Sequence, residues 1–178
     1  ESSGFQQKLE DSSVLAWTLK RLEHLKERDQ PAAEELESKV FDNDTIRRLL
    51  PSIAHDGRDG NSMLFKTLSS ERFKGNIDTI AELWPTWEDT VANYSAPILA
   101  QYAPEVAYQL FSKYIRTPIA SKDANKTYGL INALSLLPEK QAKNLLQQYF
   151  KSFVSSSKRK TVLYQITLAD AVGLAYSL

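Results

Sequence analysis

The 178-residue sequence predicts an all-α protein, and three observations carry this prediction. Apolar residues recur three and four positions apart along most of the chain, which is the spacing of an α-helix and not the alternation of a strand. Glycine occurs only six times. Proline and the capping residues Asp, Asn and Ser precede the apolar stretches, as at helix starts.

The first 53 residues predict three helices. A cap at 11–13 begins the first, and its inward stripe is Leu15, Leu19, Leu22 and Leu25. Pro31 begins the second, because proline suits the first helical position and acids follow it in the first turns, where the helix dipole favours them. Asn43 or Asp44 is the predicted cap of the third helix, which runs to Ile53.

The remaining residues predict alternating helices and breaks. Residues 55–62, with two Asp-Gly steps and one Asn-Ser step, predict a loop between helices. Helices are expected at 77–84, from Pro85, from Pro104, at 124–137, from Pro138 and at 159–177. Loops are expected at 118–125 and at the three serines 155–157.

Self-comparison indicates an internal repeat of about 35 residues. The pattern Thr-Ile-x-x-Leu at 45–49, followed by Pro51, recurs at 79–83, followed by Pro85. A longer pattern that begins with Pro-Glu at 104–115 recurs at 138–150 with one inserted residue. Two helices in each period of this length predict stacked antiparallel helix pairs, because one pair cannot bury its apolar face alone. An irregular helical bundle with coincidental proline spacing is the alternative.

These degenerate repeats resemble HEAT-like and armadillo-like α-helical repeats, over about residues 43–178. The resemblance implies an α-solenoid, with residues 1–42 as an N-terminal helical cap and 43–178 as one continuous domain of repeats. The final helix, at 159–177, is apolar nearly all round, which predicts burial on several sides. We therefore expect the chain to be a fragment of a longer protein, or to associate with itself through this helix.

Charge is unevenly distributed although the formal net charge is zero. Residues 1–60 carry −4, whereas residues 121–178 carry +5. Chance drift of surface charge is the preferred explanation of this gradient, and the functional alternative is an acidic partner at the C-terminal end or head-to-tail association. No uncharged apolar run reaches the length of a membrane span, so none is expected.

Two segments are candidate binding sites. The first joins two aromatic rings and two carboxylates: Trp84, Trp87, Glu88 and Asp89. This combination can hold a basic peptide, a sugar or a base, but packing of the two rings at an interhelix corner is the preferred explanation. The second is a short basic stretch after three serines, which fits phosphate, an acidic peptide or simply a solvated turn: Lys158, Arg159 and Lys160.

The stretch Trp87-Glu88-Asp89-Thr90-Val91 also resembles the Trp-Asp-Thr-Val segment of HEAT-repeat DNA glycosylases that remove alkylated bases. In that family an Asp follows the Val and carries catalysis, whereas this chain has Ala92 at that position. The resemblance therefore implies nucleic-acid binding without glycosylase activity. A neutral chain is also a poor match to the basic surface that phosphate contacts require.

The preferred function is a non-enzymatic scaffold that binds protein partners. The alternative is a nucleic-acid-binding HEAT-like domain, and an enzyme would need perturbed carboxylates around Glu82, Glu88 and Asp89. The one His–acid pair, His55-Asp56, has no nucleophile near it in sequence, and no phosphate-loop or metalloprotease motif is present. We predict no cofactor and no metal. The compartment stays open, with the cytoplasm or nucleus preferred.

Overall fold

A computed structural model of the chain describes residues 2–53, 60–87, 89–117, 124–154 and 162–178. Within these ranges every regular element is a helix and no residue lies in a strand, which confirms the all-α prediction. The chain divides into two compact units, Glu1–Thr86 and Trp87–Leu178. The predicted division between residues 42 and 43 falls inside the first unit.

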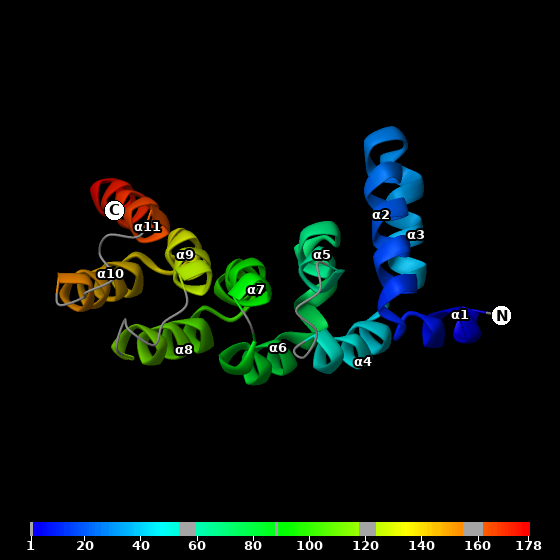
Figure 1. The fold of residues 1–178 in the computed structure, drawn as a ribbon, viewed down its shortest axis with the longest axis horizontal. Helices are drawn as coiled ribbons and strands as arrows, with labels where there is room; N and C mark the ends of the chain where they lie inside the picture. Colours follow the sequence, from blue (N-terminus) through cyan, green and yellow to red (C-terminus); the bar gives the residue numbers. More distant parts are fainter. Residues whose placement is uncertain (1, 54–59, 88, 118–123, 155–161) are drawn as a thin grey trace. The chain divides into compact units, whose positions relative to one another are not determined.

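The first unit begins with a short helix, α1 (Ser2–Lys8), which the sequence analysis missed. Helices α2 (Ser12–Arg28) and α3 (Gln30–Val40) then run side by side as a hairpin (Figure 1). The predicted caps are confirmed, since the carboxylate of Asp11 accepts the N–H of Ser13 at 2.8 Å, and Pro31 stands in the first turn of α3. Asp29 ends α2 and also caps α3, which makes the turn between them tight.

Five further elements complete the first unit: α4 (Asn43–Ile53), α5 (Gly60–Thr67), the 3-10 segment η1 (Ser70–Asn76), α6 (Ile77–Leu83) and the 3-10 turn η2 (Trp84–Thr86). Helix α5 packs against α2, and α4 packs against η1 and α6. The rings of Phe65 and Phe73 stack at 4.8 Å between centroids in the core of this unit.

Three details of the predicted elements are wrong. The cap of α4 is Asp42, not Asn43 or Asp44: its carboxylate accepts the N–H of Thr45 at 2.8 Å. Pro85 does not begin a long helix but lies in the turn η2, and the next helix starts at Asp89. Helix α5 already begins at Gly60, inside the predicted loop 55–62, of which residues 55–59 lie outside the described part.

The second unit consists of α7 (Asp89–Tyr102), α8 (Pro104–Arg116), α9 (Ala124–Ala133), the 3-10 turn η4 (Leu134–Leu136), α10 (Glu139–Val154) and α11 (Val162–Ser177). Helix α9 packs between α7 and α11, while α8 packs against both α7 and α10. Figure 1 shows the result within this unit: α7, α9 and α11 line up in one row, with α8 and α10 in a second row.

Small residues permit the tightest contact of the second unit, between α7 and α9. A Cβ atom added to Gly129 would lie 2.4 Å from the Cα of Asn93, so only glycine allows this approach of the two backbones. Ala92 and Ala96 of α7 and Ala133 of α9 are also fully buried. The α7–α9 contact is therefore specified by the lack of side-chain volume as much as by apolar burial.

Candidate interaction surface

The two tryptophans of the predicted binding corner are both buried. Trp84 is 1% exposed in the first unit, and Trp87 is 3% exposed in the second. Such burial gives each ring a packing role inside its own unit, which is the preferred interpretation of this segment. A ligand would reach these rings only after local opening of the fold. The two rings are therefore not part of the interaction surface described below.

Most other predicted site residues lie where the structure gives no side-chain detail. Glu88 and the basic stretch Lys158, Arg159 and Lys160 lie outside the described residues. Asp89 is the first residue of α7, but its side chain is not described. Their roles in binding stay predictions. Glu82, named for a hypothetical enzyme site, is exposed on α6.

Helices α8 and α10 instead meet along a polar seam that the sequence analysis did not identify. The amide oxygen of Gln148 accepts hydrogen bonds from the hydroxyl of Ser112 at 3.1 Å and from Nε of Arg116 at 3.3 Å. The amide nitrogen of Gln148 donates to Asn144 at 2.5 Å. These bonds fix both Gln148 and Arg116 in place at the surface.

Two adjoining hollows follow this seam. One, of about 560 Å³, lies between the helices and is lined by Tyr108, Ile115, Arg116, Asn144, Gln147, Gln148, Lys151 and Ser152. The other, of about 590 Å³, is lined by residues of α10 alone, namely Glu139, Lys140, Lys143, Asn144 and Gln147. Asn144 and Gln147 line both hollows, which therefore adjoin along α10. We call the two hollows together the α8–α10 groove.

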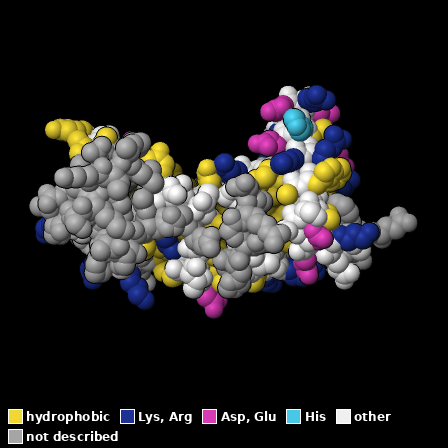
Figure 2. All heavy atoms as spheres, in the orientation of Figure 1, with side chains coloured by type: hydrophobic (Ala, Val, Ile, Leu, Met, Phe, Trp, Pro, Cys, Tyr) yellow, Lys and Arg dark blue, Asp and Glu magenta, His cyan; other side chains and the backbone are white. Residues whose placement is uncertain are grey.

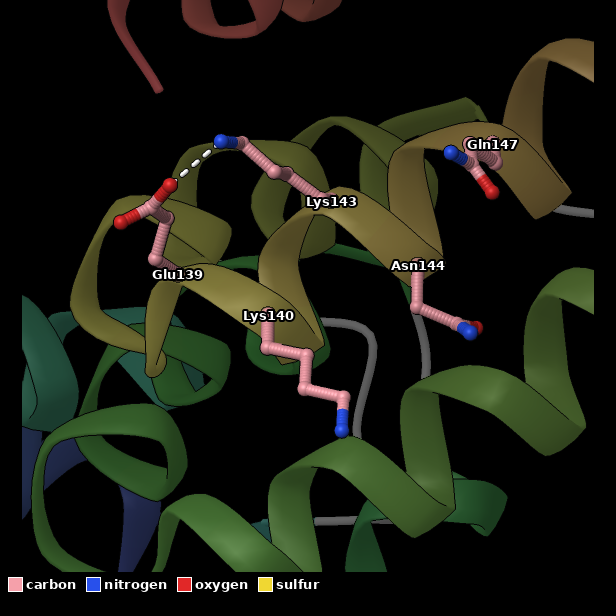
Figure 3. A pocket seen from close by; sticks show the side chains of 5 residues that line it. All are labelled: Glu139, Lys140, Lys143, Asn144 and Gln147. Atoms are coloured by element: carbon pink, nitrogen blue, oxygen red, sulfur yellow. Dashed lines mark hydrogen bonds and ion pairs between the residues drawn. The ribbon is translucent and has the colours of Figure 1, made fainter.

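Most basic side chains of the groove make no ion pair within the part of the chain that the structure describes. Lys143 pairs with Glu139 on the same helix, and Figure 3 shows this pair on one side of α10, with Lys140 and Asn144 projecting from another. Arg116, Lys140 and Lys151 make no ion pair with any residue in the described ranges. Figure 2 shows dark blue Lys and Arg side chains projecting from this part of the second unit.

The sequence of α10 explains why these side chains share one surface. Ala142, Leu145, Leu146 and Tyr149 are buried and fix the inward face. Residues 140, 144, 147 and 151 are then three or four positions apart and form an exposed or half-exposed stripe. Helical spacing in the sequence is enough to predict this stripe. The position of Arg116 beside it, however, depends on the packing of α8 against α10.

The second unit as a whole carries a matching excess of positive charge. Its residues include 10 Lys and Arg against 6 Asp and Glu, whereas the first unit has 12 against 16. The predicted charge gradient therefore coincides with the division into units. A surface of the second unit will attract anionic groups at long range at low salt.

The first unit contains a buried charge cluster of a different kind. The carboxylate of Glu37, 3% exposed, lies 2.7 Å from Nζ of Lys26 and 3.6 Å from Nε of Arg72. It also accepts hydrogen bonds from the backbone N–H and the hydroxyl of Ser69, at 2.9 and 2.7 Å. Burial raises the pKa of this carboxyl, but the bonds from Lys26 and Ser69 outweigh burial and hold the pKa below its ordinary value.

This cluster ties three segments of the first unit together. Lys26 comes from α2, Glu37 from α3 and Ser69 from the connection between α5 and η1, and Lys26 also donates to the carbonyl of Thr67 at 2.5 Å. Lys26 and Ser69 both bond directly to the Glu37 carboxylate, and Arg72 lies beside it while also lining a shallow hollow with Phe41 and Asp42. The geometry of the cluster therefore fits a structural role.

Helix α11 exposes apolar side chains in this chain. Of its described side chains Ala171 is buried, whereas Val172 is exposed and Tyr176 is 89% exposed. The expected burial on several sides is thus not reached in this part of α11. Self-association through the helix stays a prediction.

Neither a metal-binding cluster nor a membrane-spanning helix is found in the described ranges. No three His, Asp or Glu side chains gather there closely enough to hold a metal ion. No described helix combines the length and apolar character needed to cross a membrane. No protein-family model, curated protein or solved structure matches the chain, so the resemblances to HEAT-like repeats and to DNA glycosylases stay predictions.

Proposed function

We propose that the chain is a non-enzymatic protein-interaction module built of helical repeats, with the second unit as a short α-solenoid. Its pairs would be α7 with α8 and α9 with α10, followed by α11. The packing of α9 between α7 and α11, and of α8 against α10, supports this arrangement, because neighbours in a stack of pairs meet in this order.

The sequence repeat gives independent support. Its longer pattern, at 104–115 and 138–150, coincides with α8 and α10, which would occupy equivalent positions in successive pairs. Ala107 and Ala142 are both buried, as are Phe111 and Leu146. Equivalent buried positions in two helices that pack against each other are expected of repeats and not of coincidental proline spacing.

One observation carries the proposal of binding: the α8–α10 groove is polar and charged, and it lies on helices that would repeat. Stacked pairs present side chains from successive repeats on a common surface, which suits extended partners. The groove has ordered polar groups for recognition, because Gln148 is hydrogen-bonded to Ser112, Arg116 and Asn144. These fixed groups support a binding role.

The test is the capture and reconstitution of a complex. The full chain is immobilised and exposed to nuclease-treated extract of its source cells, and every retained protein is then purified and titrated against the purified chain by calorimetry. We expect at least one protein to bind with defined stoichiometry. A parallel capture uses extract that has not been treated with nuclease. If the chain retains nucleic acid from this extract and no protein from either extract, the nucleic-acid alternative replaces this proposal.

A further inference from the structure

We propose that the α8–α10 groove binds an extended, carboxylate-rich segment of the partner protein; this inference rests on the proposed function and specifies its site and the chemistry of its ligand. The groove combines three basic side chains that have no acidic partner in the described structure with a row of side-chain amides. Each of these features matches one part of an acidic peptide.

Arg116 is arranged to receive a carboxylate. Its Nε is held by the amide oxygen of Gln148, which is itself fixed by Ser112 and bonds onward to Asn144. The terminal nitrogens of the guanidinium have no partner in the described ranges, and the side chain is exposed. A guanidinium with these two nitrogens free binds a carboxylate through two parallel hydrogen bonds, and a fixed orientation reduces the entropy lost on binding.

The separation between Lys140 and Lys151 sets the length of the peptide segment that could contact both. Lys151 lines the same hollow as Arg116, whereas Lys140 stands at the other end of the groove, 11 positions earlier on α10. At 1.5 Å per helical residue the two lysines lie about 16 Å apart along α10. An extended peptide advances about 3.3 Å per residue, so carboxylates about five residues apart would reach both ends.

The amide side chains between these ends suit a peptide backbone. Asn144 and Gln147 line both hollows, and a side-chain amide can donate to a carbonyl and accept from an N–H. An extended peptide has unpaired groups of both kinds, which these residues can satisfy. The amides thereby favour a polypeptide over a free small anion.

The same groove is a poor fit for nucleic acid. Single strands bind to aromatic platforms on which successive bases stack, and the groove offers one half-exposed ring, Tyr108. Phosphate-dominated binding also uses a larger number of basic contacts than the three unpaired ones among the groove's described residues. The observations therefore favour an acidic protein segment.

The experiment measures binding of a short fluorescein-labelled peptide of alternating Glu and Ser by fluorescence anisotropy. Alternation supplies carboxylates four and six residues apart, on either side of the estimated spacing of about five, and a peptide with Gln in place of Glu is the neutral probe. The groove variant is Arg116→Glu/Lys151→Glu, and Arg116→Gln/Lys151→Gln is a milder version that preserves polar side chains. The matched control, Lys20→Glu/Arg21→Glu, makes the same charge change at exposed residues of α2.

We expect the Glu peptide to bind the parent chain and the control with similar affinity, and the neutral peptide not to bind. The Arg116→Glu/Lys151→Glu variant should weaken binding at least about tenfold, because it places like charges opposite the peptide carboxylates. The Arg116→Gln/Lys151→Gln variant should weaken binding less, because it only removes the attraction. Equal binding to parent and groove variants would overturn the inference, as would tighter groove-dependent binding of a single-stranded oligonucleotide.

A captured partner separates this inference from the proposed function. If a purified partner binds the parent chain and the groove variants equally, the groove assignment fails while the interaction module stands. If no protein partner binds the chain at all, the proposed function itself fails.

Discussion

Removal of the Glu37 carboxylate is the sharpest test of how the first unit is held together. In Glu37→Ala, Lys26 loses an ion pair at 2.7 Å, and the backbone N–H and hydroxyl of Ser69 lose their acceptor. Arg72 loses the nearby charge as well. One substitution thus removes the group on which α2, α3 and the α5–η1 connection converge.

The expected loss of folding free energy follows from what each partner can do afterwards. Removing one partner of a buried ion pair typically costs about 3–5 kcal/mol, because the other charge stays buried. The Lys26 side chain is 25% exposed and can turn toward water, which lowers its share. The stranded N–H of Ser69 costs about 1–3 kcal/mol. We therefore expect a loss of about 3 kcal/mol, and less in Glu37→Gln, which keeps one acceptor oxygen.

The assay needs a probe confined to the first unit, because two units need not unfold in one transition. In a Trp87→Phe background the remaining tryptophans, Trp17 and Trp84, both belong to the first unit, so fluorescence in urea reports on it alone. The control is Glu35→Ala, which breaks an exposed ion pair with Lys39 on the same helix and should have no measurable effect. A loss below about 1 kcal/mol for Glu37→Ala would refute the reasoning.

Three further predictions follow. Because the pKa of Glu37 is lower in the folded chain, its stabilisation should be complete above the ordinary Glu range and fade as the pH falls below about 4.5, and Glu37→Gln should flatten that part of a stability–pH curve. Gly129→Ala should destabilise the second unit by about 1–3 kcal/mol in thermal melts, because its Cβ would meet the backbone of Asn93, whereas Gly173→Ala, with open space around it, should be neutral or stabilising. Trp84→Ala should cost the first unit about 3–5 kcal/mol in urea unfolding, and a loss under about 1 kcal/mol would contradict its packing role.

Local signals in the sequence predicted most helix starts. Asp11, Pro31 and Pro104 stand where caps and first turns were expected, because side-chain caps and the missing proline N–H act within a few residues. The same local rules misplaced the cap of α4 by one residue, since Asp42, Asn43 and Asp44 are all good caps and only the backbone path selects one. Pro85 shows the converse, as a helix-start signal used in a short turn.

Local sequence signals do not predict which residues far apart in the chain will contact one another. Glu37 meets Ser69, 32 positions away, and no periodicity relates the two. Trp87 and Trp84 looked like a binding corner because their neighbours are acidic, yet both rings are buried in the structure. The exposed stripe of α10 was readable from helical spacing, but its partner Arg116 became visible only through the packing of α8 against α10.

The most direct test of the account is a map of the binding surface by nuclear magnetic resonance. A ¹⁵N-labelled chain is titrated with the Glu–Ser peptide, and shifts of the backbone amides and of the side-chain amides of Asn144, Gln147 and Gln148 are followed. The account predicts saturable shifts concentrated in residues 104–116 and 139–154. Two results would contradict it: shifts confined to the first unit, or no shifts at peptide concentrations that saturate binding in the anisotropy experiment.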